Sequence, residues 1–176
     1  KHYPAIDWLE SYSNYPDYIK GWWEKEVDLE WSEMELNWYQ CRRKMNQILS
    51  RENELQNMMQ LVGEENLPED QQLDIFIADL IKEGFLIQNA FDDIDNYTSP
   101  TKMMAMAKLI LLLYREGKEL LRQGYIIKDI KEMEVINKIK RIKNTVPNDE
   151  MDRIEEIKDS LFEQIKSLKR LYGVIG

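Results

Sequence analysis

The sequence predicts an all-α protein, a helical bundle of about five to seven helices preceded by an aromatic-rich entering loop. Apolar residues recur every three or four positions over long stretches, which is the spacing of one face of a helix. No stretch rich in Val, Ile and Thr alternates apolar with polar residues, so no strand is expected. The chain has 176 residues, 43% of them hydrophobic, and we treat residues 1–176 as a single domain with one core.

Residues 1–30 form the entering aromatic segment. All five tryptophans of the chain, including Trp8 and Trp22, lie within the first 40 residues. Side chains of this kind usually anchor a large contact, either in the core or against another domain. Lys1 to Asp7 show no helical period and predict a loop.

Residues 31–125 form the predicted helical core. Apolar residues from Trp31 to Val62 keep the helical spacing except at Glu52, and Gly63 follows, where glycine suits a left-handed C-terminal cap. One helix is therefore expected from Trp31 to Gly63. A second is expected from about Pro68 to Gln88, with the proline in its first turn.

A third helix is expected to begin at Ser99 and Pro100, an N-cap serine followed by a proline. It is apolar almost all round from Met103 to Tyr114, which predicts burial by its neighbours. Residues 126–176 form the C-terminal helices: one or two short ones over 126–143, then a long one over about 148–172 that ends before Gly173.

The charge is concentrated in the middle of the chain. The formal net charge is -9, and residues 51–100 hold 12 acidic side chains and two basic ones. Such a field favours a basic partner and repels phosphate backbones, so no nucleic acid is expected to bind. A solvated acidic face kept for solubility is the alternative interpretation.

The chain lacks the residues of a complete catalytic site. It has no glycine-rich phosphate loop, and His2 is its only histidine, so neither a serine triad nor a histidine metal site can form. Cys41 is the only cysteine, and Asp92, Asp93 and Asp95 lack the spacing of a calcium loop. No catalytic residue and no metal ligand is predicted. No leader and no membrane insertion is expected either, because the apolar stretch from Met103 to Tyr114 is too short for a span.

Three strings of the sequence resemble a known family. They are Tyr3-Pro4-Ala5-Ile6-Asp7-Trp8-Leu9, the run from Leu55-Gln56 to Leu61-Val62-Gly63, and Phe85-Leu86-Ile87-Gln88-Asn89-Ala90-Phe91. In order and spacing they resemble the C-terminal helical domain of the catalytic A subunit of V-type and archaeal A-type rotary ATPases. The resemblance covers about residues 1–125. Asp7 stands where the family often has Asn, and Ile87 where it has Gln.

The resemblance implies a function. It implies that ATP or ADP with Mg²⁺ binds mainly to a preceding α/β domain of the intact subunit, which hydrolyses or synthesises ATP coupled to H⁺ or Na⁺ transport. The helical domain would close over the adenine, with Tyr3 and Phe91 stacking on the base and Gln88, Asn89 and Ala90 along its edge.

The resemblance also implies partners. The acidic loop 64–70 would face the central stalk through Glu64, Glu65, Leu67, Glu69 and Asp70, and the B subunit of the ATPase would be a neighbour. The complex would place this domain in the soluble ATPase head, peripheral on the cytoplasmic side of the membrane. The alternative is a stand-alone helical interaction module with an acidic docking face.

The isolated chain is expected to show no ATPase activity and to bind ATP weakly, because nothing in it cradles phosphates or Mg²⁺. Phosphate release by the purified chain, compared with a buffer blank, measures this. Hydrolysis abolished by a single substitution within residues 1–176 would contradict the prediction.

Overall fold

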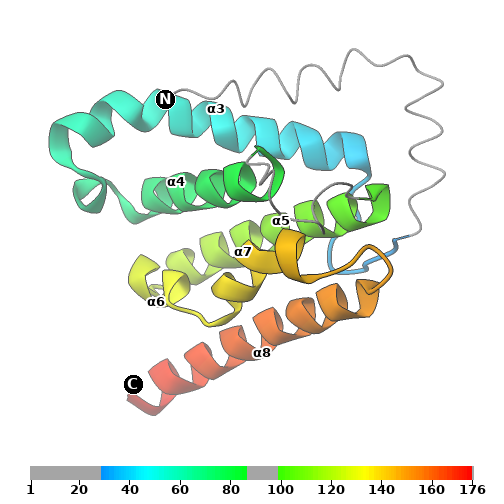
Figure 1. Cartoon of the computed structure of the whole chain (residues 1–176). Helices are drawn as coiled ribbons and strands as arrows, with labels where there is room; N and C mark the ends of the chain where they lie inside the picture. Colours follow the sequence, from blue (N-terminus) through cyan, green and yellow to red (C-terminus); the bar gives the residue numbers. More distant parts are fainter. Residues whose placement is uncertain (1–28, 87–98, 176) are drawn as a thin grey trace.

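The computed structural model describes residues 29–86 and 99–175 (Figure 1). Within these ranges every regular element is helical and no strand occurs, which confirms the all-α class. The elements are α3 (Trp38–Val62), the 3₁₀ turn η1 (Glu64–Asn66), α4 (Glu69–Ile81), the π-helical turn η2 (Lys82–Leu86), α5 (Pro100–Arg122), α6 (Ile127–Lys131), α7 (Val135–Thr145) and α8 (Met151–Ile175).

Helix α5 lies at the centre of the bundle. Every side chain from Met104 to Leu113 is buried, and Lys108 is the only polar one among them. Helices α3, α4, α6, α7 and α8 all contact α5. The predicted burial of this helix by its neighbours is therefore confirmed. Each fully buried leucine or isoleucine contributes roughly 1.5–3 kcal/mol to stability, so covering α5 dominates the fold.

Helix α4 crosses α5 at close range because of a glycine. A Cβ atom at Gly117 would lie 3.2 Å from both terminal methyl carbons of Leu73. Leu73 is fully buried, so it has little room to move aside. Any larger residue at position 117 would push the two helices apart.

Helix α3 begins later than the apolar spacing predicts. Asn37 caps it: its side-chain oxygen accepts a hydrogen bond from Gln40 N at 2.8 Å, and Gln40 Oε1 accepts one from Asn37 N at 2.9 Å. This reciprocal pair satisfies two backbone donors and fixes Trp38 as the first helical residue. The predicted start at Trp31 is wrong. Trp31 nevertheless lies in the core, because burial requires an apolar side chain and not a helical backbone.

Two predicted helix boundaries, at Gly63 and Ser99, are confirmed, and the ends of α4 and α8 differ from the prediction. Gly63 adopts a φ of 85° and donates to Met59 O at 2.9 Å, as a C-terminal cap should. Ser99 accepts from Lys102 N, so the predicted cap of α5 is confirmed. Regular α-helix in α4 stops at Ile81 and passes into the π-helical turn η2. Gly173 lies inside α8 and does not end it.

Two buried charged side chains have polar partners on other elements. Glu52 is the polar interruption in the apolar face of α3, and its carboxylate lies 2.8 Å from Lys82 Nζ and accepts from Gln56 at 2.6 Å. Lys102, almost fully buried, donates to Lys143 O at 3.0 Å near the C-terminal end of α7. That end of a helix carries a partial negative charge, which stabilises a cation there.

Cys41 is a buried core residue. It has no disulfide partner among the described residues, and burial raises the pKa of its thiol to about 11. A thiol with so high a pKa stays protonated and unreactive at neutral pH, so Cys41 contributes packing and no chemistry.

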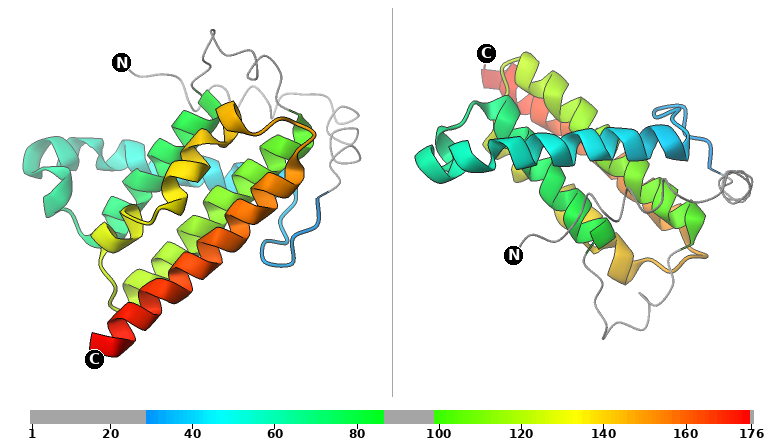
Figure 2. Two further views of the ribbon diagram at one scale, coloured as in Figure 1. Left: turned by 60° about the horizontal axis from the view of Figure 1, so that its bottom comes forward. Right: turned by 90° about the horizontal axis from the view of Figure 1, so that it is seen from above.

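The α3–α4 hairpin projects from the bundle. Helix α8 lies alongside α5, whereas the end of the hairpin extends past the other helices (Figures 1 and 2). A segment covered on fewer sides is available to a partner.

Candidate functional site

The predicted nucleotide-contacting residues lie outside the described part of the chain. These are Tyr3, Gln88, Asn89, Ala90 and Phe91. Either side of residues 87–98 the chain is anchored, because Phe85 is buried and Ser99 N donates to Asn148 at 3.0 Å.

The predicted contact loop lies at the projecting end of the hairpin. The residues from Gly63 to Asp70 join α3 to α4 through the turn η1. We call residues 63–70 the hairpin tip. All four of its carboxylates are expected to face a partner, and the structure divides them into two groups.

Two carboxylates of the tip are bound to helix α6. Glu64 forms an ion pair with Lys131 at 3.1 Å, and Glu69 accepts a hydrogen bond from the backbone N of Ile127 at 3.3 Å. The Lys131 ammonium also lies 5.7 Å from the ring centre of Phe76. These contacts connect the tip to the C-terminal helices, and nothing in the spacing of the sequence predicts them.

The other two carboxylates of the tip are available. Glu65 and Asp70 are exposed, and neither forms an ion pair within the described residues. Within the tip, they are therefore the two acidic side chains that a basic partner can reach without breaking an ion pair among the described residues.

Leu67 has a structural role in the tip. Only 5% of it is exposed, and its carbonyl accepts a hydrogen bond from the Gln72 side chain at 2.8 Å. The same Gln72 amide lies 3.4 Å from Glu65 O. Because one buried side chain binds two carbonyls of the loop, the tip has a defined shape.

An exposed apolar patch adjoins the tip. Met58, Leu61 and Val62 are 50%, 80% and 42% exposed. Their spacing of three and four residues places them on one face of α3. The apolar spacing predicts Val62 as a core position, because it continues to the helix end. Val62 is exposed because the helices that cover α3 end before the apolar spacing of α3 ends. In the sequence, the adjacent apolar pairs at 58–59 and 61–62 indicate that this end of α3 has a second apolar face.

A polar network makes the base of the hairpin rigid. Asp74 of α4, almost completely buried, lies 3.2 Å from Arg51 Nε of α3 and accepts from the Tyr114 hydroxyl of α5 at 2.5 Å. Burial and the bond to Asp74 raise the pKa of Tyr114 well above its usual value, so the phenol remains a donor. The network ties three helices together at one point.

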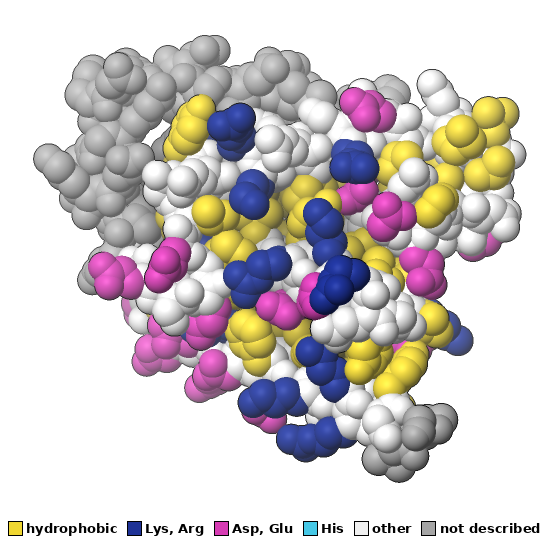
Figure 3. Space-filling model, turned by 180° about the vertical axis from the view of Figure 1, so that it is seen from behind, with side chains coloured by type: hydrophobic (Ala, Val, Ile, Leu, Met, Phe, Trp, Pro, Cys, Tyr) yellow, Lys and Arg dark blue, Asp and Glu magenta, His cyan; other side chains and the backbone are white. Residues whose placement is uncertain are grey.

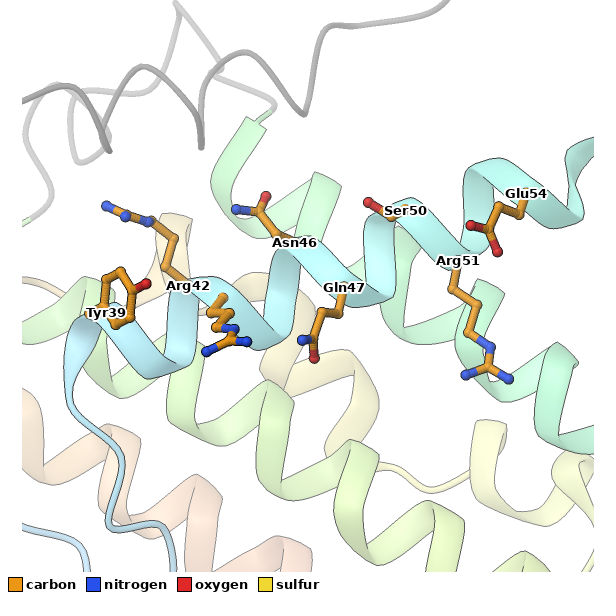
Figure 4. A pocket seen from close by; sticks show the side chains of 8 residues that line it. Tyr39, Arg42, Asn46, Gln47, Ser50, Arg51 and Glu54 are labelled. Atoms are coloured by element: carbon orange, nitrogen blue, oxygen red, sulfur yellow. The ribbon is translucent and has the colours of Figure 1, made fainter.

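The outer face of α3 carries a shallow polar pocket of about 610 Å³. Figure 4 shows its lining, which comes from α3 alone: Tyr39, Arg42, Arg43, Asn46, Gln47, Ser50, Arg51 and Glu54. It contains no nucleophile paired with a base, and a site on one helix face cannot surround a substrate. This pocket offers no catalytic arrangement.

No metal site or membrane span is present among residues 29–86 and 99–175. No group of three or more His, Cys, Asp and Glu side chains is placed there to hold an ion. None of the helices in these ranges combines the length and the apolar character needed to cross a bilayer. The tip and the apolar patch are therefore the strongest candidate site in the described protein.

The fold and this surface define an all-helical domain with a projecting hairpin. The family described as the C-terminal domain of V and A type ATP synthase matches residues 21–131. The chain belongs to this family.

Relatives give the same result. The A subunit of the A-type ATP synthase of Ignicoccus hospitalis is 40% identical over 170 residues, which are 96% of this chain and 27% of that protein. The corresponding A subunit of Staphylothermus marinus is 42% identical over 166 residues, 94% of this chain and 26% of that protein. The V-type ATP synthase alpha chain of Halothermothrix orenii is 34% identical over 157 residues, 89% of this chain and 25% of that protein. The chain spans about a quarter of the length of these curated relatives.

The tip geometry predicts opposite outcomes for two leucine substitutions. Leu67→Ala should lower the free energy of unfolding by about 2–4 kcal/mol, because it leaves a cavity under the loop. Leu61→Ala, at an exposed position, should change it by less than about 0.5 kcal/mol. Urea denaturation followed by circular dichroism measures both. Equal losses would show that the tip does not have this structure.

Proposed function

We propose that this chain is the C-terminal helical domain of the nucleotide-binding catalytic subunit of a V/A-type rotary ATPase. The observation that carries the proposal is the family match over residues 21–131, in a chain that aligns with about a quarter of each relative. ATP hydrolysis or synthesis, coupled to H⁺ or Na⁺ transport, belongs to the intact subunit. The partial coverage favours a domain of a larger subunit over a stand-alone acidic module.

In this proposal the hairpin tip contacts the central stalk. Three features support it: the hairpin projects (Figure 2), Glu65 and Asp70 are exposed and not paired within the described residues, and an apolar patch lies beside them. A coiled-coil surface with basic side chains around apolar ones would match all three. Glu64, Leu67 and Glu69, predicted as contacts, would instead shape the tip.

The internal contacts of the tip suit a domain that moves as one body. Glu64 and Glu69 bind α6, and Asp74 links α3, α4 and α5. A force on the tip would therefore pass to the bundle and not bend the loop. Hinge motion of the whole domain is then the way in which nucleotide state and stalk position would be coupled.

The nucleotide is proposed to lie at the other functional surface. Tyr3 and Phe91 would stack on the adenine, and Gln88, Asn89 and Ala90 would line its edge. Phosphates and Mg²⁺ would be held by residues beyond this chain, since the chain has no phosphate loop. The B subunit would border this domain in the soluble head, on the cytoplasmic side of the membrane.

Removing the two available carboxylates tests the stalk contact. Glu65→Gln combined with Asp70→Asn should weaken binding to the central stalk by about three- to tenfold at low salt, since exposed pairs contribute less than about 1 kcal/mol each. The loss should shrink at high salt because exposed charges are screened. Titration by calorimetry at two salt concentrations measures both effects.

A matched control is available on α8. Glu155→Gln with Glu156→Gln removes two exposed carboxylates that form no ion pair within the described residues. This variant should bind the central stalk as tightly as wild type does. Equal binding by the tip variant and wild type at low salt would refute the electrostatic contact.

Loss of either stacking ring should weaken nucleotide binding in the intact subunit. Tyr3→Ala or Phe91→Ala should remove roughly 1–3 kcal/mol each, and because phosphate binding remains, the change should appear mainly as a raised KM. Steady-state ATPase kinetics measure it, with Tyr39→Ala, an exposed tyrosine on α3, as the control. Unchanged KM and kcat in both variants would assign these rings to packing.

A further inference from the structure

A second surface lies between α3 and α5, away from the tip. It is a groove of about 500 Å³. One wall is the face of α3 that carries Lys44, Ile48 and Arg51, and the other is the face of α5 that carries Leu111 and Lys118. We call it the α3–α5 groove. From Arg51, the groove residue of α3 nearest the tip, to the end of α3 at Val62 the helix axis advances about 17 Å, at 1.5 Å per residue, so the groove and the tip are separate surfaces.

The groove has an apolar floor between cationic walls. Ile48 and Leu111 lie beneath the groove and are 4% and 2% exposed, whereas the half-buried Leu36 and Tyr114 leave apolar surface open to it. Lys44, Arg51, Arg115 and Lys118 contribute four cations to the lining, against the single carboxylate of Glu35. The face shown in Figure 3 carries several Lys and Arg side chains beside hydrophobic ones, with Asp and Glu side chains among them. In a chain of net charge -9, the lining of the groove is a local reversal of sign.

The two lysines of the groove have no carboxylate partner within the described residues. Lys44 forms no ion pair there, and the Lys118 ammonium lies 4.7 Å from the ring centre of Tyr114. They stand on opposite walls. Their charges are therefore available to an anion, one from each side of the apolar floor.

The arginines of the groove are held in place and only partly used. Arg51 binds Asp74 through Nε at 3.2 Å, which leaves its two terminal nitrogens for another acceptor. Arg115 donates to Glu33 O at 2.6 Å and lies 3.1 Å from Glu116. In Figure 4, Gln47 and Arg51 point toward the lower edge of α3 as viewed, and Asn46 and Ser50 point toward its upper edge.

We propose that the α3–α5 groove binds an acidic amphipathic helix of a partner protein. A stripe of apolar side chains would lie on the half-buried Leu36 and Tyr114, and carboxylates on both sides of the stripe would meet Lys44 and Lys118. Charge complementarity selects this occupant over a small phosphate. The cations are spread over two walls with apolar side chains between them, so a small anion would reach one wall at a time.

The test uses the full chain and a designed probe. The probe is a peptide of about 18 residues, long enough for five helical turns, with a leucine stripe flanked by glutamates on both sides. Fluorescence anisotropy at roughly 50 mM salt, where screening is weak, should show saturable binding. A peptide of the same composition in scrambled order should bind at least about tenfold more weakly, because its apolar and acidic residues do not segregate.

Two variants with the same change in net charge test whether the peptide binds in the α3–α5 groove. Lys44→Glu with Lys118→Glu should weaken binding at least about tenfold. Lys140→Glu with Lys169→Glu changes the net charge equally at exposed lysines of α7 and α8 that form no ion pair in the described residues, and it should weaken binding less than about twofold. Should charge reversal disturb the fold by circular dichroism, Lys44→Gln with Lys118→Gln replaces it, with a loss of about threefold expected.

Three results would overturn the proposal. They are no binding of the striped peptide, equal losses in the two charge-matched variants, and inorganic phosphate displacing the peptide at millimolar concentration. The last would identify a simple anion site. None of these results bears on the stalk contact of the tip, which is tested by other residues.

Discussion

From Met103 to Tyr114, helix α5 is apolar around almost its whole circumference, and the arrangement of the other helices follows from the need to cover this stretch. A helix with one apolar face needs one neighbour, whereas a helix without a polar face needs neighbours on every side. Helices α3, α4, α6, α7 and α8 supply them. Even Lys108, the one polar residue from Met104 to Leu113, is covered by the neighbouring helices. Its burial lowers the pKa of its ammonium group.

The need to cover α5 also explains why the last turns of α3 and the hairpin tip lie outside the bundle. Helix α3 has 25 residues and is longer than its covered part, so its last turns extend from the bundle with the tip (Figure 1). The apolar residues Met58 and Leu61 there are 50% and 80% exposed. An exposed stripe of this kind marks an interaction site. The proposed stalk contact thus arises from the same constraint that builds the core.

Polar groups inside the bundle fix how the helices meet. Glu52 with Lys82, and Asp74 with Arg51, each join α3 to α4 or its extension. Loss of Lys82 or Arg51 would leave the carboxylate of Glu52 or Asp74 buried without its cation, which destabilises the fold. Side-chain interdigitation limits sliding of one helix along another, and these pairs limit it further. These pairs keep α3 and α4 in one register, as the proposed movement of the domain as one body requires.

The sequence by itself determined the helical class, the caps at Gly63 and Ser99 and the burial of α5, because each depends on residues close together in the chain. The absence of a phosphate loop and the family resemblance also follow from short strings of the sequence. Only the tertiary structure decided that Leu67 is buried, that Glu64 and Glu69 bind α6, and that Leu61 is exposed. Exposure and pairing depend on which distant segment covers a residue. Three-four spacing shows that a helix has an apolar face, and it cannot show where the partner of that face ends.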